Sequence, residues 1–231
     1  MNNPIIILDF DGTIADTQSL IIRTMQQTIE HLGLPRRTNE ECAAMIGLPL
    51  KETFIRLIPM NDEMGDRCVD TYVEFFNENN QPGTVPLFPD VKETLERLHR
   101  NGVVLTIATS RHRASLMAFL NEMNMESLVS YIICGNDVNH PKPAPDMVEK
   151  TLEALGASKE NVFVVGDAVY DIGMGRNAGV RTVGVTYGNG KRNELEEAGA
   201  DRLIDGFAEL PAIVEKFNRQ CRCIDSKQSC V

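Results

Sequence analysis

The stretch PIIILDFDGT, residues 4–13, decides how this chain folds. Its apolar run, Ile5 to Leu8, is typical of a strand buried on both faces of a parallel sheet. The run ends at two carboxylates, Asp9 and Asp11. Like charges this close repel each other, so the pair is favoured only where a cation lies between them or one carboxyl stays protonated. The stretch therefore predicts a buried strand that carries a charged site to the edge of a sheet.

Further apolar, β-rich runs alternate with helical patterns along the rest of the chain. The predicted strands span residues 5–8, 103–108, 131–133, 162–165, 182–185 and, as a weak edge strand, 202–204. The helices between them have readable ends, such as the Asn101-Gly102 pair that closes one of them. Strand and helix in alternation imply right-handed crossovers. The sequence therefore predicts an α/β fold with a Rossmann-like, doubly wound parallel sheet.

One connection is far longer than a β-α-β crossover requires. It joins the first strand to the second and has helical periodicity, with three helices predicted. The first begins at Asp16 as N-cap, and the second begins at the capping box of residues 38–41. No strand pattern occurs within it. We therefore expect a small α-helical cap domain at residues 17–82, inserted into an α/β core formed by residues 1–16 and 83–231.

Composition excludes several classes of partner. With 231 residues, of which 42% are apolar and 24% charged, the chain has the make-up of an ordinary globular protein. Its formal net charge of −10 argues against nucleic acid or an anionic membrane surface as a partner, since both require a basic face. No apolar run approaches the ~18 residues of a membrane span. No basic region precedes the first apolar run, so we expect a cytoplasmic protein.

The six cysteines lack paired CxxC spacing, which favours free thiols in a reducing compartment. Cys221, Cys223 and Cys230 cluster in a polar tail. A metal site there would lack a fourth obvious ligand, so a frayed terminus is the favoured interpretation.

Ligands of open α/β sheets bind beyond the carboxyl ends of the strands, so the residues that follow each predicted strand are the candidates for a site. Four strand ends carry polar side chains of suitable chemistry. In chain order these residues are Asp9, Asp11, Thr109, Ser110, Arg111, Lys142, Asp167 and Asp171. Carboxyl ends of parallel strands share one edge, so we expect these side chains to converge.

The residue types at these strand ends fit phosphoryl transfer. A phosphate ester and an aspartate are both anions, so attack of one on the other requires a divalent cation and fixed positive donors. Asp9 and Asp167 are candidate ligands of Mg²⁺, which prefers hard oxygen ligands. Thr109 and Lys142 are candidates to hold the phosphoryl oxygens. Asp11 is then free to act as general acid and base while Asp9 carries the phosphoryl group.

Each element also has a simpler explanation. The Asp9–Gly12 segment could be a surface turn, and Lys142 could be a solvated loop residue. Asp167 and Thr109 could cap the helices that follow them, and Asp171 could be a first-turn residue that favours the helix dipole. Four such accidents would all have to fall at the ends of predicted parallel strands. The ordered coincidence therefore favours the catalytic interpretation.

The same four segments resemble the ordered motifs of the haloacid dehalogenase superfamily. The segments are DFDGT at residues 9–13, the Thr109-Ser110 step, PKPAPD at 141–146 and GDAVYD at 166–171, and the resemblance spans nearly the whole chain. It implies that Asp9 is the nucleophile. Asp11 would be the general acid and base, and its main-chain carbonyl would also meet the Mg²⁺.

The resemblance implies roles for the remaining site residues as well. Phosphate binding would fall to Thr109, Ser110 and Lys142. Asp167 would join Asp9 and Asp11 as a metal ligand, and Asp171 would support the ligands from behind.

The helical insertion after DFDGT resembles the cap of the phosphoglycolate phosphatase and pyrophosphatase branch. This implies a Mg²⁺-dependent phosphatase that acts on a small phosphorylated metabolite through an aspartyl-phosphate. Phosphoglycolate is the first substrate to test and pyrophosphate the second. We expect a monomer or homodimer, with no nucleic acid and no membrane as partner.

Rival functions stay open at this point. A β-phosphoglucomutase-like phosphomutase resembles the chain in core and cap, but such mutases usually carry a His in the first cap helix, where this chain reads SLIIR at residues 19–23. A dehalogenase is disfavoured, because Asp11 would have no leaving alcohol to protonate. A phospho-receiver signalling module also pairs acidic residues with a Thr and a Lys. Such a module is about half this length and lacks the insertion.

Substrate choice is expected to lie largely in the cap. The turn around Gly47 could present backbone N–H groups to the site. Arg23 and Lys51 in the cap, and Arg111 beside Thr109, could meet a second anionic group of the substrate. For each of these cations, a solvated position on a helix surface is an equally open interpretation.

Overall fold

The computed structural model describes residues 3–217 of the chain. Six strands form one sheet in the order β3-β2-β1-β4-β5-β6, and every neighbouring pair is parallel. Their bounds are β1 Ile5–Leu8, β2 Val104–Thr109, β3 Tyr131–Cys134, β4 Val162–Gly166, β5 Arg181–Val185 and β6 Arg202–Ile204. The predicted fold class is confirmed, and each predicted strand lies within one residue of the observed bounds.

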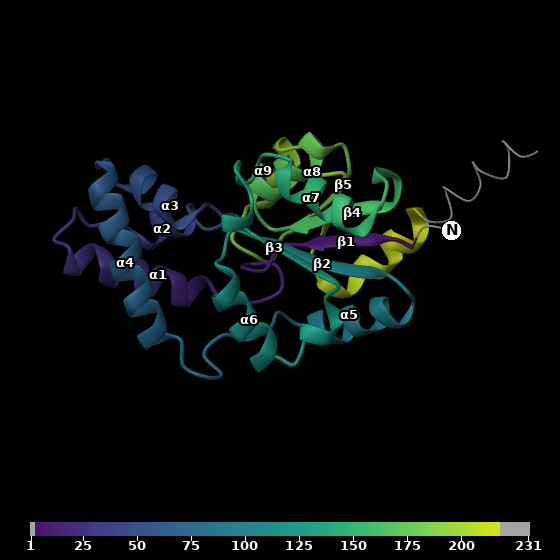
Figure 1. Cartoon of the computed structure of the whole chain (residues 1–231), viewed down its shortest axis with the longest axis horizontal. Coiled ribbons are helices and arrows are strands. Elements are labelled where there is room, and N and C mark those ends of the chain that lie inside the picture. Colours follow the sequence, from purple (N-terminus) through teal and green to yellow (C-terminus); the bar gives the residue numbers. More distant parts are fainter. Residues whose placement is uncertain (1–2, 218–231) are drawn as a thin grey trace, which may run out of the picture.

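Helices cover both faces of this sheet (Figure 1). The core helices are α5 Val91–Arg100, α6 Arg113–Glu122, α7 Asp146–Leu155, α8 Val169–Ala178 and α9 Arg192–Glu197. Short 3-10 turns are η1 Glu126–Leu128, η2 Gly135–Asp137, η3 Lys159–Asn161 and η4 Phe207–Glu209, and residues 210–217 are helical. Helices α7 and α8 lie on one face, and α5 and α6 lie on the other.

Strand β1 is buried along its whole length, as its apolar run predicts. Side chains alternate between the two faces of a strand. Ile5 and Ile7 therefore join the core beneath α7 and α8, which contains Val148. Ile6 and Leu8 join the core on the opposite face, which contains Phe119 of α6. The first strand thus anchors the centre of the sheet from both sides.

The long insertion is helical and lies beyond the carboxyl ends of the strands (Figure 1). Its helices are α1 Gln18–His31, α2 Asn39–Ala43, α3 Leu50–Leu57 and α4 Asp62–Asn79. The capping box predicted before α2 is confirmed, since the Thr38 hydroxyl accepts from the Glu41 N–H at 3.1 Å and the Glu41 carboxylate accepts from the Thr38 N–H at 2.7 Å. Helices α1 and α4 pack side by side and carry most of the insertion's core.

Two details of the insertion differ from the prediction. Helix α1 begins at Gln18 rather than directly after Asp16, because Thr17 is its N-cap and the Thr17 carbonyl accepts the first helical bond from the Ile21 N–H at 3.0 Å; the Asp16 N–H donates to Pro86 O at 2.9 Å in the connection between cap and core. Helix α3 was not predicted. It has only eight residues, too few to show a clear helical period, although Phe54 and Leu57 are buried in the cap core.

The two chain segments that join the insertion to the sheet run side by side. Ala15 forms an antiparallel bridge with Leu87, and the Phe88 N–H donates to Ile14 O at 3.1 Å. Because both connections are held to each other, any movement of the insertion must pivot on this paired segment.

Cys42, Cys68 and Cys134 are buried free thiols, as predicted. The Cys221, Cys223 and Cys230 tail lies outside the described residues. Within residues 3–217, no helix combines the length and the apolar content needed to cross a membrane.

Candidate active site

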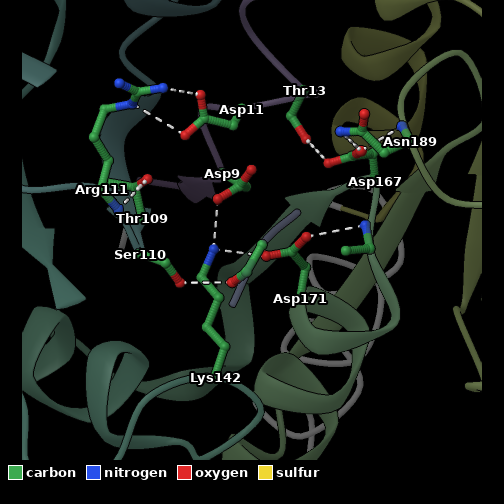
Figure 2. Close-up of polar contacts among 12 residues, drawn as sticks. Asp9, Asp11, Thr13, Thr109, Ser110, Arg111, Lys142, Asp167, Asp171 and Asn189 are labelled. Carbon is green, nitrogen blue, oxygen red and sulfur yellow. Dashed lines mark hydrogen bonds and ion pairs between the residues drawn. The ribbon is translucent and has the colours of Figure 1, made fainter. Parts of the chain in front are cut away.

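The ends of β1, β2 and β4, together with the loop after β3, meet at one edge of the sheet (Figure 2). Asp9 follows the central strand β1, Thr109 ends β2, and Asp167 follows β4. Because β2 and β4 flank β1, Asp9 lies at the point where the chain order of the sheet reverses, which is where ligands bind in such folds. The convergence expected for Asp9, Thr109, Lys142 and Asp167 is present.

Lys142 is a buried cation between two carboxylates (Figure 2). Its Nζ donates to Asp9 Oδ1 at 2.6 Å and to Asp171 Oδ1 at 2.7 Å, and its side chain is 1% exposed. Burial alone lowers the pKa of Lys142, but the Asp171 and Asp9 carboxylates raise it above its ordinary value. Lys142 therefore stays charged, and the interpretation of it as a solvated loop residue is wrong.

Asp171 has a second contact that fixes its orientation. Its Oδ2 accepts from the Ala168 N–H at 3.1 Å, in the first turn of α8. A carboxylate at this end of a helix also favours the helix dipole. Asp171 is therefore both a residue of the first turn of α8 and the second partner of Lys142. The two interpretations from the sequence, a helix-terminus residue and a site residue, are compatible.

Asp167 is held by donors from two other loops. Its Oδ1 accepts from Thr13 Oγ1 at 3.1 Å, and its Oδ2 accepts from the N–H and the Nδ2 of Asn189 at 2.6 and 2.9 Å. Burial and, after it, the Asp171 carboxylate raise the pKa of Asp167, and the bonds from Asn189 and Thr13 lower it, so that the pKa is about 7. The carboxyl group is rigidly placed rather than left to cap a helix.

Thr13 and Asn189 were missed by the sequence reasoning. Asn189 lies in the Gly188-Asn189-Gly190 turn after β5, at the same sheet edge, so examining the end of the fifth strand would have found it. Both glycines of this turn are needed, because a Cβ on Gly190 would lie 2.0 Å from Asp167 O and one on Gly188 would lie 2.4 Å from Asp167 Cβ. The turn thus packs directly on the Asp167 backbone and side chain.

The carboxylates of Asp9, Asp167 and Asp171 form a buried cluster in which each offers an oxygen within 4.8 Å of the others. Burial raises the pKa of Asp9 well above its ordinary value; Lys142 lowers it, and the neighbouring carboxylates raise it. One lysine cannot neutralise this group. Hard oxygen donors with excess negative charge fit a divalent cation such as those that carboxylates bind in phosphoryl-transfer sites.

Asp11 points away from this cluster and toward Arg111 (Figure 2). Arg111 donates to both carboxylate oxygens of Asp11, from Nε at 3.1 Å and from Nη2 at 2.5 Å. The guanidinium also lies over the rings of Phe10, Phe76 and Phe119, 4.9 to 5.8 Å from their centroids. Arg111 is therefore a partner of Asp11, enclosed by rings from both the core and the cap helix α4.

The hydroxyl groups at the end of β2 have unequal roles. The Ser110 Oγ donates to Gly47 O of the cap at 2.6 Å, and Thr109 Oγ1 accepts from the Arg111 N–H at 3.2 Å. Gly47 has a φ of 103°, a left-handed conformation that favours glycine. The Ser110–Gly47 contact therefore ties the cap to the floor of the site.

The other cap candidates lie apart from the site. Lys51 pairs with Asp66 at 2.9 Å and with Asp62 at 3.5 Å, so its charge is used within the cap. Arg23 is exposed on α1. Neither side chain lines the cavity next to Asp9, whereas Gly47 and Arg111 do.

A cavity of about 660 Å³ lies between cap and core. Asp9, Asp11 and Thr109 line its core side, and residues of α1, α3, α4 and the 45–48 loop line its cap side. This volume is in the range that suits a small organic ligand. The charged sheet edge thus faces a cavity between cap and core that is partly open to solvent.

Comparisons with known proteins agree with this geometry. The family model described as haloacid dehalogenase-like hydrolase matches residues 6–185. Among curated proteins, the chain is 34% identical over 212 residues to "Probable phosphatase IndB" of Dickeya dadantii (strain 3937), covering 90% of this chain and 91% of that protein. It is 33% identical to pyrophosphatase PpaX of Anoxybacillus flavithermus (strain DSM 21510 / WK1), covering 95% of this chain and all, 100%, of that protein.

A solved structure shares the same fold. It is described as "Putative haloacid dehalogenase-like hydrolase", from Bacteroides fragilis, and superposes with a TM-score of 0.85 at 28% identity. The match covers 90% of this chain and 100% of that one. The sheet, the helical insertion and their connection therefore occur together in a related protein.

Proposed function

The chain belongs to the haloacid dehalogenase-like hydrolase family, and from this premise we propose that it is a phosphatase that hydrolyses small phosphate monoesters with Mg²⁺ through an aspartyl-phosphate on Asp9. The observation that carries the proposal is the Lys142 ammonium, buried between Asp9 and Asp171 at 2.6 and 2.7 Å. A fixed cation beside a carboxylate that faces a cavity is what attack on an anionic phosphate requires.

Asp9 is the nucleophile in this proposal. Lys142 holds its Oδ1, while Oδ2 has no hydrogen-bond partner among the described residues and Asp9 lines the cavity. Oδ2 is therefore free to attack phosphorus. The P–O bond to the leaving alcohol breaks as the Asp9–phosphorus bond forms, and Lys142 compensates the charge of the reacting group.

Asp9 and Asp167 would hold the Mg²⁺, with the main-chain carbonyl of Asp11 as a further ligand. When bound, the ion neutralises phosphoryl oxygens and so permits the approach of two anions. Thr13 and Asn189 keep Asp167 in place for this role. Asp171, held by Lys142 and the first turn of α8, supports the ligands from behind.

Asp11 is proposed to move the protons. It gives a proton to the oxygen of the leaving alcohol, and then takes one from the water that attacks the phosphorus of the aspartyl-phosphate. Arg111 keeps the Asp11 carboxyl at the cavity wall. Thr109, Ser110 and Lys142 are proposed to bind the phosphoryl oxygens, with Ser110 contributing through the cap contact as well.

A panel of esters tests the proposal. Phosphate release from p-nitrophenyl phosphate, phosphoglycolate, pyrophosphate and sugar phosphates is measured with and without Mg²⁺. Asp9→Asn should abolish Mg²⁺-dependent turnover, because the amide cannot form the acyl-phosphate, while the circular dichroism spectrum stays native. Asp70→Asn, an exposed carboxylate on α4, is the matched control and should turn over normally.

Near-normal turnover by Asp9→Asn would remove Asp9 from the nucleophile role. Phosphate release from no member of the panel would remove the phosphatase proposal. Substrate identity within the class is open to the same assay, and phosphoglycolate stays a prediction.

Pyrophosphate hydrolysis is the second candidate. It is favoured by the 33% identity and nearly complete mutual coverage with pyrophosphatase PpaX. A β-phosphoglucomutase-like reaction is less favoured, because α1 carries no His in residues 19–23, where Ile21 lines the cavity. The phospho-receiver alternative is disfavoured by the cap, which a receiver module does not have.

A further inference from the structure

We infer that the preferred substrate is a phosphate ester whose organic group is uncharged and largely apolar, and that this group binds against the cap wall of the cavity. The inference rests on the proposed phosphatase function, because it assigns the leaving group of that reaction. It narrows the substrate class from small phosphate esters in general to one chemical type.

The cap wall of the cavity is largely apolar, with Thr53, Tyr72, Asn77 and Asn80 as its polar residues. It is formed by side chains from α1, the loop before α3, α3 itself and α4, among them Ile21, Met25, Met45, Leu50, Val69 and Val73. Methionine adapts its shape to irregular apolar ligands. A hydrocarbon or aromatic group placed here leaves water and contacts this wall, so binding energy is available to the remote part of the substrate.

Among the described residues, the cap side of the cavity holds no Lys, Arg or His that could meet a second anionic group. Among the described residues that line the cavity, Arg111 is the one Lys or Arg, and both oxygens of Asp11 occupy it. His112, exposed at the start of α6, also lines the cavity, but on its core side rather than on the cap wall. A carboxylate or second phosphate on the leaving group would therefore lose its hydration against apolar side chains without gaining a partner.

An exposed apolar side chain of α4 points to a ligand in the same place. Val73 is 41% exposed and is the one large apolar side chain in residues 3–217 that is exposed, and it lines this cavity. An apolar organic group bound against the cap wall would cover this side chain and remove it from water.

The volume of the cavity supports the same class of substrate. A space of about 660 Å³ is large for a phosphoryl group with a two-carbon acid, and it suits an organic group of drug-like dimensions. The wall joins the floor directly, because the Ser110 Oγ contacts Gly47 O at 2.6 Å. A leaving group that extends from a phosphate near Asp9 therefore meets the cap wall.

A homologous series of esters tests the inference. The kcat/KM values of ethyl, butyl and hexyl phosphate are compared with those of phosphoglycolate and pyrophosphate, all with Mg²⁺. We expect kcat/KM to rise about fourfold for each added methylene, from the transfer free energy of a buried CH₂ group, until the cavity is filled. Phosphoglycolate, which replaces the methyl group of ethyl phosphate with a carboxylate, should fall below ethyl phosphate.

A charged substitution in the wall provides the complementary test. Val73→Lys should lower kcat/KM for hexyl phosphate about tenfold and raise it for phosphoglycolate, because it places a cation in the cavity at an already exposed position. Glu74→Gln changes the net charge by the same +1 on the neighbouring exposed residue, which does not line the cavity. It should leave the order of substrates unchanged.

Binding without turnover gives an independent measurement. The dissociation constants of ethyl-, butyl- and hexylphosphonate for the wild-type protein with Mg²⁺, measured by calorimetry, should tighten along the series. Because the phosphonate measurement uses the wild-type protein, it tests the inference even if a variant fails to fold.

The outcomes separate the two proposals. If esters are hydrolysed but kcat/KM and phosphonate affinity are independent of chain length, or if phosphoglycolate or pyrophosphate is preferred, the inference is overturned and the phosphatase proposal stands. If no ester or diphosphate is hydrolysed, the phosphatase proposal itself fails. A rising series, reversed by Val73→Lys and not by Glu74→Gln, supports the inference.

Discussion

The floor of the cavity, at the sheet edge, and its cap wall, on α1, α3 and α4, are built from opposite kinds of side chain. On the floor, Lys142, Asp167 and Asp171 are buried charges, and each is held by at least two hydrogen bonds. The wall presents apolar side chains such as Met25 and Val73, and the Ser110 Oγ joins it to the floor by a hydrogen bond to Gly47 O. The difference supports the proposals that the sheet edge carries the chemistry and that the insertion selects the substrate.

The physical reason is that a substitution costs more free energy on the floor than on the wall. A buried charge that loses its partner costs several kcal/mol, so the floor tolerates little change. On an apolar wall, replacing one apolar side chain by another of similar volume usually costs less than about 1.5 kcal/mol of stability. A wall of this kind can therefore change its shape while the floor stays the same.

The largest effect is expected from removing the cation of the floor. Lys142→Met leaves Asp9 and Asp171 without their shared partner, so kcat should fall by about 10²–10³, the range seen when a preorganised donor is removed from an active site. Steady-state phosphate release from p-nitrophenyl phosphate measures the loss. Lys159→Met, at an exposed lysine, is the control and should be near wild type. Comparable activity in the two variants would show that Lys142 is structural only.

A second test separates the proton-transfer group from the rest of the floor. Arg111→Met removes both contacts to Asp11 and should lower kcat/KM about 10²-fold for an alkyl phosphate, whose leaving group needs a proton. The loss should be much smaller for p-nitrophenyl phosphate, because nitrophenolate leaves without one. Arg113→Met, on the exposed neighbour, should change neither value appreciably. Equal losses on the two substrates would contradict a role for Arg111 in positioning Asp11.

The carboxylate cluster should also make stability depend on pH and metal. Burial raises the pKa of Asp167 to about 7 and that of Asp9 well above its ordinary value. Between about pH 4 and pH 7 the folded, metal-free protein then holds protons that the unfolded chain has released, so stability falls as pH rises through this window. For Asp167 the loss is on the order of 4 kcal/mol.

Thermal unfolding from pH 5 to pH 8 measures this effect. The Tm of metal-stripped protein should decrease over the range, and the increase in Tm on adding Mg²⁺ should grow, since the ion requires the ionised carboxylates. Asp167→Asn should flatten the first trend and reduce the second, while Asp70→Asn should reproduce wild type. A Mg²⁺ effect that shrinks with rising pH would contradict the assignment of the cluster as the metal site.

The smallest effect is expected where floor and wall meet. Ser110→Ala removes one hydrogen bond to Gly47 O, with a net contribution of about 1 kcal/mol, so KM should rise about fivefold while kcat changes little. Ser158→Ala, whose hydroxyl contacts Glu160 far from the cavity, is the control. A large fall in kcat with unchanged KM would instead place Ser110 in the chemical step.

Much of this comparison could be predicted from local patterns. Apolar runs in the sequence predicted all six strands, and the polar residues that follow four of them predicted the residues of the floor. Both predictions were possible because a buried strand and the loop after it differ in polarity over consecutive residues. The capping box at Thr38 was predicted for the same reason. Helix α3 was missed, since eight residues are too few to show a clear helical period. The hydrogen bond from the Asp16 N–H to Pro86 O was also not predictable, because it joins residues seventy positions apart.

By itself, then, the amino-acid sequence determined the α/β class, the helical nature of the insertion and the identity of the charged groups at the sheet edge. Tertiary structure alone decided what surrounds them: Asn189 and Thr13 on Asp167, Arg111 on Asp11, and a cavity whose cap side, within residues 3–217, holds no Lys, Arg or His. Local patterns report hydrogen bonding and burial over a few residues. Contacts such as Thr13 with Asp167 join residues 154 positions apart, and only the packed chain brings them within hydrogen-bond distance.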